Sequence, residues 1–396
     1  MKNERKGLKN KSILLGVTGG VAAYKAIDLI RRLREEGSSV SVIMTEAAKH
    51  FVTPLSLEVA SQNSVYSNLY STPMAHITLP SKADIMVIAP ATANSIGKFA
   101  HGIADDLLST CFLAFSGTVI MAPSMNWRMY ENPVFQKNLK SLLSRGILQI
   151  GPEKGSLACG EEGTGRMSEV SDIIDTIKYS LTEKDLLHEK ILITAGPTRE
   201  YLDPVRFISN RSSGKMGYSI AKAAARRGAE VTLISGPSSL QQPKGVHFIP
   251  VETAGDMLNA VTTKLRTSTV LIMSAAVSDF MPSKRSGQKM EKSGELLLHL
   301  KQTPDILAEA GKKKNRPFLI GFSAESGGKI DNARKKMKEK NINMIVYNDV
   351  TEPGAGFDVD TNRVVIIDNK KETAFPLLNK EAVADAILDR MVEIKA

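Results

Sequence analysis

The sequence predicts an α/β protein made of two Rossmann-like three-layer domains with mainly parallel sheets. Three observations support this prediction. An order of strand, glycine turn, amphipathic helix and strand opens the chain, the same order returns near the middle, and further apolar runs alternate with helical patterns after each opening. A chain of 396 residues is long enough for two or three domains.

The first opening reads "SILLGVTGGVAAYKAIDLIRRLREEGSSVSVIMT". The apolar run Ile13–Val17 is typical of a strand buried on both faces, and Val40–Met44 resumes a strand after Gly37. Between them, five apolar residues recur at helical spacing: Ala22, Ala26, Leu29, Ile30 and Leu33. This is a βαβ unit, whose crossover is expected to be right-handed.

The second opening has the same order with little residue identity. We expect a strand at Ile191–Thr194, a helix at Met216–Arg227 and a strand at Glu230–Ile234. Neither opening contains G-x-G-x-x-G, and the second strands end at Thr45 and Ser235 where a dinucleotide fold would place an acidic residue. The pattern argues against a nicotinamide dehydrogenase, while the glycine turns favour phosphate at a helix N-terminus.

Further strands continue both halves, so we expect ligands at the carboxyl ends of parallel strands. A helix over "SDIIDTIKYS" and a charged joint separate the halves, which predicts domains at residues 1–189 and 190–396. The additional strands are expected at Ile85–Ala89, Val119–Ala122, Val270–Ser274, Phe318–Phe322, Met344–Tyr347 and Val364–Ile367.

The net charge of +10 is unevenly spread. Residues 1–190 hold 21 Lys and Arg against 19 Asp and Glu, a balance of +2, which leaves +8 for the remaining residues. A basic second half indicates an anionic partner or a solvated basic face. Aromatic residues make up 5% of the chain and no nucleic-acid motif is visible, so we expect no nucleic-acid partner.

The composition also bears on the compartment. No apolar run is long enough to span a bilayer, and the basic start "MKNERKGLKNK" is interpreted as a tail before the first strand, with no signal peptide. Two cysteines cannot build a disulfide framework, so we expect a cytoplasmic protein without a membrane partner.

Short polar clusters follow the expected strands of the first half. Each alone suits an ordinary loop or helix cap, but four clusters at the carboxyl ends of one sheet favour a site for a phosphate and a planar ring. They are Thr18–Gly20, Thr45, "APATANSIGKFAHGIADDLL" (Ala89–Leu108) and "APSMN" (Ala122–Asn126).

Three single residues in the first half stand out. His76 lies in "PMAHITL" before a strand-like segment, and Asn126 lies in "PSMNWRMYENP". Cys159 lies in the glycine-rich polar loop "SLACGEEGTGRMSE". Taken alone, these residues suit a structural histidine, a turn residue and a free surface thiol. Cys111, inside an apolar helical pattern, is expected in the core.

The second half offers several anion-binding elements. "TAGPTREYLDPVRFISNRSSGKMG" (Thr194–Gly217) supplies glycine turns and arginines before a helix, without the order of a Walker A loop. "TPDIL" is interpreted as a helix start with Thr303 as N-cap and Pro304 at the first helical position. Lys336 and Lys340 are four residues apart, so both lie on one face of a helix.

These motifs resemble one family over almost the whole chain. The "MAHI" histidine, the run Ala89–Leu108, the P-x-M-N-x-x-M element at Pro123–Met129 and the "ACG" loop are similar to the flavin-dependent cysteine decarboxylases. With the second half, the pattern resembles the bacterial bifunctional phosphopantothenoylcysteine decarboxylases/phosphopantothenate–cysteine ligases of coenzyme A biosynthesis.

The resemblance implies a flavodoxin-like first half that binds FMN. The flavin would oxidise the thiol-bearing carbon of the substrate, so that loss of CO₂ leaves a stabilised enethiolate. His76 would assist the oxidation, Asn126 would hold the substrate carboxylate, and Cys159, on a closing loop, would return the proton. The implied FMN contacts are Thr18, Gly19, Gly20, Thr45, Pro90, Ala91 and Thr92.

The resemblance implies a nucleotide-binding ligase in the second half. The carboxylate of 4′-phosphopantothenate would attack CTP to give an acyl-cytidylate, and cysteine would then displace CMP, with Mg²⁺ accompanying the nucleotide through ligands that the resemblance leaves unknown. Asn210 would serve conversion of the acyl-cytidylate, and Lys289 would assist its formation. The implied CTP contacts are Ala275, Asp279, Lys289, Pro304, Asp305, Ile306, Leu307, Phe322, Lys336 and Lys340.

One position departs from the family pattern. In the family, the flap that carries the assisting lysine commonly reads K-x-K-K. Here it reads "KMEK" (Lys289–Lys292), so Glu291 replaces the middle basic residue. The resemblance further implies a homo-oligomer, with trimeric flavin halves and dimeric ligase halves. Two alternatives remain at this stage: a flavoprotein binding module with a basic nucleic-acid-binding second half, and a protein in which only one half is active.

Overall fold

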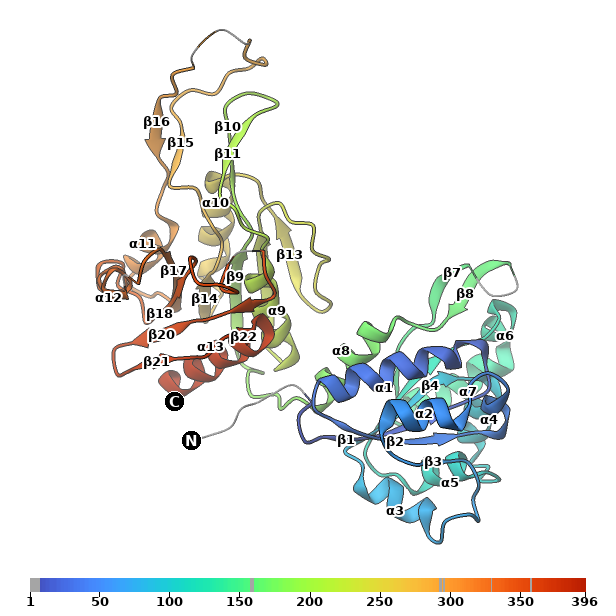
Figure 1. The fold of residues 1–396 in the computed structure, drawn as a ribbon. Coiled ribbons are helices and arrows are strands. Elements are labelled where there is room, and N and C mark those ends of the chain that lie inside the picture. Colours follow the sequence, from blue (N-terminus) through green and yellow to red (C-terminus); the bar gives the residue numbers. More distant parts are fainter. Residues whose placement is uncertain (1–7, 157–159, 292–293, 295, 329, 357) are drawn as a thin grey trace. The chain divides into compact units, whose positions relative to one another are not determined.

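The structure is a computed structural model that describes residues 8–156, 160–291, 294, 296–328, 330–356 and 358–396. The chain divides into two compact units, Met1–Thr182 and Glu183–Ala396 (Figure 1). The division falls seven residues before the predicted boundary at 189, because the segment that follows α8 (Val170–Leu181) packs on the second unit. Leu186, for example, is buried in a core cluster of the second unit.

The first unit is built on a parallel six-stranded sheet in the order β3-β2-β1-β4-β5-β6. Without the two-residue edge strand β3, this is the order of a flavodoxin-like fold, which confirms the predicted class. The strands are β1 Ser12–Val17, β2 Ser39–Met44, β3 Val65–Tyr66, β4 Ile85–Ala91, β5 Thr118–Pro123 and β6 Leu148–Gln149.

Helices cover both faces of this sheet, because the central strands are apolar on both sides. In β1, Ile13 and Leu15 face a core shared with α1, α2 and α8, while Leu14 faces a core shared with α3, α4, α5 and α7. Cys111 of α5 is buried in the second of these cores, as predicted. The helices are α1 Lys25–Glu35, α2 Pro54–Ser61, α3 Ala75–Lys82, α4 Ala93–His101, α5 Leu107–Ala114, α6 Trp127–Glu131 and α7 Pro133–Ser144.

A hairpin stands apart from the sheet of the first unit. Its strands, β7 (Glu153–Ser156) and β8 (Glu162–Arg166), pair antiparallel, and β8 contacts α6. Two short 3₁₀ helices, Val21–Tyr24 and Glu46–His50, follow β1 and β2. All of these segments lie toward the carboxyl ends of the strands, where a ligand site is expected.

The second unit is built on an eight-stranded sheet in the order β13-β12-β9-β14-β17-β18-β20-β21. Six strands run parallel, and β20 and β21 add an antiparallel edge. The strands are β9 Lys190–Ala195, β12 Glu230–Ser235, β13 His247–Pro250, β14 Val270–Met273, β17 Phe318–Glu325, β18 Met344–Asp349, β20 Val365–Asp368 and β21 Glu372–Ala374.

The helices of the second unit again form two outer layers. Helices α9 (Lys215–Arg226) and α13 (Lys380–Lys395) share one core with the sheet. Helices α10 (Ala254–Leu265), α11 (Ile306–Gly311) and α12 (Ile330–Glu339) share the other. The confirmed architecture is therefore two α/β units with mainly parallel sheets.

Two antiparallel arms extend from the second unit (Figure 1). One is β10 (Arg199–Tyr201) with β11 (Phe207–Ser209), and the other is β15 (Phe280–Pro282) with β16 (Leu300–Gln302). The arms contact each other through β10 and β15. A further short pair, β19 (Thr361–Asn362) with β22 (Leu378–Asn379), precedes α13.

Two local predictions are wrong. His76 does not precede a strand: it lies in α3, because the sheet ends on that side at β3 and the segment packs on α5 instead. Helix α11 is not capped by Thr303, whose hydroxyl donates to the Ser278 carbonyl at 2.5 Å. The carboxylate of Asp305 caps this helix by accepting the Ala308 N–H at 3.0 Å, so Pro304 lies outside the helix.

Two candidate active sites

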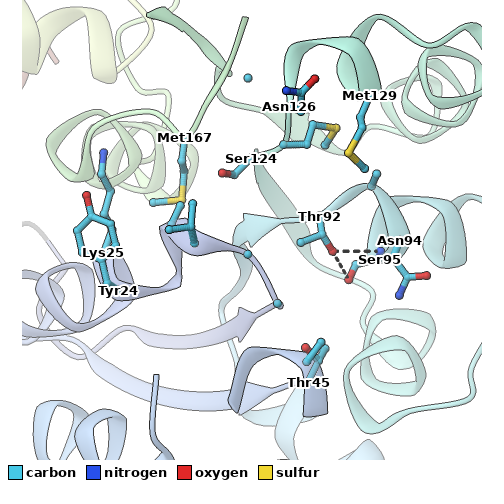
Figure 2. Close-up of a pocket in the computed structure, with 18 of the residues that line it drawn as sticks. Tyr24, Lys25, Thr45, Thr92, Asn94, Ser95, Ser124, Asn126, Met129 and Met167 are labelled. Carbon is cyan, nitrogen blue, oxygen red and sulfur yellow. Dashed lines mark hydrogen bonds between the residues drawn. The ribbon is translucent and has the colours of Figure 1, made fainter. Parts of the chain in front are cut away.

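A pocket of about 810 Å³ opens at the carboxyl ends of the strands in the first unit (Figure 2). Its wall is formed by segments that follow β1, β2, β4 and β5, together with the hairpin strand β8. The polar clusters predicted from the sequence therefore meet at one place. Of the predicted FMN contacts, the pocket is lined by Gly19, Gly20, Thr45 and Thr92.

Three other predicted FMN contacts lie beneath the residues that line the pocket. The buried Thr18 hydroxyl donates to the Pro90 carbonyl at 2.7 Å and accepts the Thr92 N–H at 3.0 Å. Ala91 is fully buried in the core. Thr18, Pro90 and Ala91 thus lie beneath the lining residues of the pocket and hold Thr92 in place.

Thr92 caps helix α4 at the pocket wall. Its hydroxyl lies 3.2 Å from the Ser95 hydroxyl, and both side chains are drawn beside Asn94 in Figure 2. On the other side of the pocket, the Thr45 hydroxyl is buried and makes no hydrogen bond to any residue that the structure describes. An unpaired buried hydroxyl is costly unless a ligand completes it, so this atom marks the pocket as a binding site.

Asn126 lines the pocket and caps helix α6. Its side-chain oxygen accepts the Arg128 N–H at 2.9 Å, and its amide nitrogen lies 3.5 Å from Glu161 Oε2. The same carboxylate accepts the Trp127 indole N–H at 2.8 Å. The Asn126 amide therefore faces a carboxylate, which in this structure belongs to the hairpin residue Glu161.

His76 is partly buried in α3 and does not line this pocket, whereas Cys159 lies outside the described residues. Met125 and Met129, the methionines of the P-x-M-N-x-x-M element, supply apolar surface at the pocket together with Met167, which the sequence did not single out. Met167 lies far along the chain from that element, so no local pattern connects it with the pocket.

The pocket also contains a lysine with a clear structural role. Lys98 forms ion pairs with Asp105 at 2.7 Å and with Asp106 at 2.8 Å. Burial disfavours the cation, but the two hydrogen bonds outweigh it and raise the pKa of Lys98. Asp106 also caps α5 by accepting the Ser109 N–H, and Lys98 helps to lower the pKa of Asp106 against the effect of burial.

A second pocket, of about 820 Å³, lies at the carboxyl ends of the strands in the second unit. It brings together residues predicted from five separate motifs. Asn210 lines it, and so do nine of the ten predicted CTP contacts: Ala275, Asp279, Pro304, Asp305, Ile306, Leu307, Phe322, Lys336 and Lys340.

The exception is Lys289. It is exposed in the segment between β15 and β16 and does not line the pocket. The adjacent Met290 N–H donates to the fully buried Asp203 carboxylate at 3.1 Å, which ties this segment to the β10–β11 arm. Glu291, which departs from the K-x-K-K pattern of the family, is the next residue of this segment after Met290.

The lysines of the second pocket are held by carboxylates. Lys336 lies 2.5 Å from Glu325, and Lys340 lies 2.8 Å from Asp305. Burial raises the pKa of each carboxyl, but hydrogen bonds from the lysines outweigh it and leave both pKa values below their ordinary range. The two carboxyl groups of the site are therefore ionised at neutral pH, where each pairs with a lysine.

Asn210 is oriented by the backbone. Its amide nitrogen donates to the carbonyls of Ala276 at 3.2 Å and Val277 at 2.9 Å. Both donor hydrogens are used by these contacts, which leaves the side-chain oxygen as the group that can act on a ligand. Among the other residues that line the pocket, the sequence did not single out Lys215, Asn348, Asn362 and Lys380.

Comparison with known proteins assigns both halves. A family described as "Flavoprotein" matches residues 1–182, and one described as "DNA/pantothenate metabolism flavoprotein C-terminal domain" matches residues 186–394. The coenzyme A biosynthesis bifunctional protein CoaBC of Bacillus subtilis (strain 168) is 44% identical over 399 residues, covering 98% of each chain. Its counterpart in Escherichia coli (strain K12) is 45% identical over 395 residues, covering 97% of each.

This chain belongs to that family of bifunctional coenzyme A biosynthesis proteins. It is accordingly an enzyme with a flavoprotein decarboxylase half and a ligase half, which confirms the resemblance deduced from the motifs. As in other members of the family, the two halves follow one another in a single chain of matching length.

Solved structures match each half separately. The C-terminal domain of a coenzyme A biosynthesis bifunctional protein CoaBC is 41% identical, covers 54% of this chain and 98% of that one, and has a TM-score of 0.47. The FMN-dependent cysteine decarboxylase SpaF is 28% identical, covers 44% of this chain and 99% of that one, and has a TM-score of 0.40. No helix among the described residues is long and apolar enough to cross a membrane.

Proposed function

We propose that the second half of this CoaBC-family chain joins 4′-phosphopantothenate to cysteine with CTP, and that the first half decarboxylates the product to 4′-phosphopantetheine with FMN. The observation that carries the ligase assignment is the gathering of Asn210 and nine predicted CTP contacts around one pocket. The decarboxylase assignment is supported by the pocket of hydroxyl, amide and apolar groups in the flavoprotein half.

The residues of the first pocket fit a flavin mononucleotide. Thr45 offers a buried hydroxyl that makes no hydrogen bond to described residues, and Thr92 and Ser95 stand at the start of α4, where a phosphate would be favoured. Gly19 permits the close approach of the 3₁₀ helix after β2, because a Cβ there would lie 2.4 Å from the Ala47 Cβ. Bound FMN would supply the electron sink that makes loss of CO₂ from the substrate possible.

Asn126 is proposed to hold the substrate carboxylate. Its amide already faces the carboxylate of Glu161, so a substrate carboxylate could take the same position. In that position the carboxylate would meet the Trp127 indole N–H and the Arg128 guanidinium as well, since both now hold Glu161. Displacement of Glu161 would also release the hairpin from Trp127 and Arg128.

Cys159 is proposed as the proton donor at the end of the reaction. Cys111 is unsuited to that role, because burial raises the pKa of its thiol to about 12. Cys159 is connected to β8, whose residues Gly165 and Arg166 line the pocket. His76, proposed to assist the oxidation, does not line the pocket of its own chain.

In the ligase half, Lys336 and Lys340 are proposed to bind CTP phosphates. Both lysines line the pocket, and each is held by an ion pair, Lys336 with Glu325 and Lys340 with Asp305. Asp279 also lines the pocket and offers a carboxylate to the Mg²⁺ that would accompany the nucleotide. Cations at these points would stabilise the charge that develops as pyrophosphate leaves.

Asn210 and Lys289 are proposed to act in the two successive steps of ligation. Lys289, on the exposed segment between β15 and β16, would approach the pocket when the nucleotide binds and assist formation of the acyl-cytidylate. Asn210 presents its side-chain oxygen, which can accept a hydrogen bond from the cysteine amine as that amine attacks.

A homo-oligomer is also proposed, with trimeric flavin halves and dimeric ligase halves, in the cytoplasm. The flavin half exposes large apolar side chains on and near α3 and α5, among them Tyr70 (88% exposed), Met74 (58%) and Leu113 (54%). Surfaces of this kind are typical of association sites. Size-exclusion chromatography with light scattering would give the number of chains; a monomer would contradict the proposal.

The whole assignment is tested by mass spectrometry of the products made from 4′-phosphopantothenate, cysteine and CTP, beside a visible absorption spectrum of the purified protein. We expect 4′-phosphopantetheine, CMP and pyrophosphate, with the absorption of bound flavin. Cys159→Ser should stall the decarboxylase reaction after loss of CO₂ and leave ligation intact, whereas Lys289→Gln should stop ligation alone. A protein that neither retains nor takes up FMN would contradict the first assignment.

A further inference from the structure

Three cationic residues lie together at one end of the ligase pocket, apart from the lysines of α12. Arg211 precedes helix α9, Lys215 is the first residue of that helix, and Lys380 is the first residue of α13; all three line the pocket. None of the three is among the residues to which the proposed function gives a role. Figure 1 shows α9 and α13 side by side on one face of the sheet, and they share a core.

Lys380 is built into this end of the pocket. Only 5% of the residue is exposed, and its ammonium group donates to the carbonyls of Gly356 and Val359. Burial, and then the nearby charge of Lys215, lower the pKa of Lys380. Two lysines that repel each other at the wall of a pocket would both be stabilised by an anion bound there.

Two uncharged side chains at the same end have buried oxygen atoms to which a bound ligand could hydrogen-bond. The Ser274 hydroxyl is buried and makes no hydrogen bond within the described ranges, and it lies beside the first turn of α9, 2.9 Å from where a Cβ on Gly217 would be. Asn362, 5% exposed, likewise has a buried side-chain oxygen without a hydrogen bond to any described residue. These atoms can bind a phosphate oxygen and a hydroxyl or metal-bound water, respectively.

Two carboxylates occupy the cations in the structure. Asp358 Oδ2 accepts a hydrogen bond from Arg211 Nε at 2.8 Å, and Asp360 Oδ1 lies 2.7 Å from Lys215 Nζ. Lys215 also donates to the Asp358 carbonyl at 2.8 Å. The carboxylates of Asp358 and Asp360, in the segment before β19, therefore contact the same cations that a bound phosphate would contact.

We propose that Arg211, Lys215 and Lys380 form the subsite for the terminal phosphates of the nucleotide, and that Asp358 and Asp360 occupy this subsite until those phosphates displace them. The inference rests on the proposed ligase function. Because these ion pairs are largely exposed, each contributes little and can be exchanged for a phosphate at small cost. Gly214 has φ +82° directly before the N-terminus of α9, and the backbone N–H groups of a helix N-terminus favour a bound anion.

The first test removes the two competing carboxylates. The double variant Asp358→Asn/Asp360→Asn should bind CTP and inorganic pyrophosphate about threefold to tenfold more tightly, measured by isothermal titration calorimetry, since two exposed ion pairs no longer compete. Glu372→Gln is the matched control: it removes a carboxylate that pairs with Arg334 outside the pocket. Affinities of the double variant within error of this control would overturn the proposal.

The second test removes the buried cation. Lys380→Met should weaken pyrophosphate binding at least tenfold, because the bound anion loses its buried cation. Thermal unfolding shows whether this variant is folded; if it is not, the double aspartate variant decides alone. If the affinity for 4′-phosphopantothenate changes in these variants while that for CTP and pyrophosphate does not, the assignment to the nucleotide is overturned.

Pyrophosphate binding needs no turnover, so the subsite and the ligase function can fail separately. A protein that binds pyrophosphate with the expected pattern but forms no CMP from CTP, cysteine and 4′-phosphopantothenate supports the subsite and contradicts the proposed function. A protein that ligates normally in all of these variants, with unchanged affinities, contradicts the subsite alone.

Discussion

The two halves of the chain use one scaffold for two kinds of ligand. Each has a parallel sheet covered by helices on both faces and a pocket at the carboxyl ends of its strands. The flavoprotein pocket is lined mainly by hydroxyls, amides and methionines, whereas the ligase pocket is lined by lysines paired with carboxylates. The difference teaches that the fold gives the place of a site, while the side chains at the strand ends decide its chemistry.

The substitution expected to have the largest effect on one site alone is at Gly165, where β8 approaches the flavin pocket. A Cβ at this position would lie 2.0 Å from the backbone oxygen of Met125, beside Asn126. Gly165→Ala should therefore displace the carboxyl end of β5 and lower decarboxylation by more than about a hundredfold. Ligation should stay unchanged.

The measurement is the rate of each reaction with its own substrate, beside the flavin absorbance of the purified protein. Gly163→Ala would not serve as a control, because a Cβ there would meet Trp127 at 2.6 Å. Gly97→Ala, in α4 of the same half, is the control, because the added Cβ would lie at an ordinary contact distance, 3.8 Å from the Asn138 amide nitrogen. Loss of both reactions in Gly165→Ala would show that the halves are not independent.

The corresponding position in the ligase half is Gly217 in the first turn of α9. A Cβ there would lie 2.6 Å from the Ala195 Cβ and 3.0 Å from the Thr194 carbonyl oxygen. Gly217→Ala should push α9 away from β9 and lower ligation by about a hundredfold, because the pocket is lined by residues of both the α9 N-terminus and β14.

The expected pattern is the reverse of that for Gly165→Ala. Formation of CMP from CTP should fall, while conversion of supplied 4′-phosphopantothenoylcysteine and the flavin spectrum stay as in the unaltered protein. Gly255→Ala in α10 is the control in this half, because the added Cβ would lie at an ordinary contact distance, 3.6 Å from the Thr253 hydroxyl oxygen. Equal losses in both reactions would contradict the separation of the two sites.

A smaller effect, that of ionic strength, should distinguish the two pockets by their charge. Raising the ionic strength from about 0.05 M to about 0.5 M shortens the screening length severalfold, so the KM for CTP should rise about tenfold. Retention of flavin should change by less than about twofold, since that pocket relies on hydroxyls, amides and apolar contact. Equal salt dependence of both reactions would remove the electrostatic distinction between the halves.

The sequence predicted the parts of each site that follow buried strands. Thr45 and Thr92 could be placed because an apolar strand ends just before each of them, and parallel strands bring such ends together. Lys380 and Asn362 could not, since they reach the ligase pocket from the C-terminal segment, far along the chain from Lys215. No local pattern records a contact between residues so widely separated.

The wrong local predictions have a similar cause. The segment around His76 has the β-branched composition of a strand, but the sheet offers it no partner beyond β3, and Ala75 and Pro80 are buried in a helix instead. At "TPDIL", Thr303 was predicted to cap the helix, but its hydroxyl donates to the Ser278 carbonyl, and Asp305 caps α11 instead.

The smallest expected effect concerns the stability of each half. Asp106 caps α5 in the flavin half and Thr253 caps α10 in the ligase half, both in capping boxes. Asp106→Ala and Thr253→Ala should each cost about 1 kcal/mol of unfolding free energy, and each should shift only the calorimetric transition of its own half. A single shared transition, moved equally by both variants, would contradict independent units.

Asp106→Asn separates the cap from the ion pair, because asparagine still caps the helix but cannot pair with Lys98. Burial raises the pKa of Asp106, but hydrogen bonds from Lys98 and Ser109 outweigh it and hold the pKa below its ordinary value of 3.8. A carboxyl with a lowered pKa stabilises the fold above that ordinary value and loses the contribution as pH falls through its folded pKa. Unfolding titrations should therefore show Asp106→Asn less stable than the unaltered protein by less than about 1 kcal/mol near pH 7, with the difference vanishing in acid below pH 3.8. A difference that persisted unchanged into strong acid would mean that the amide disturbs the cap itself, and the ion pair would then have no part in holding Lys98 at the flavin pocket.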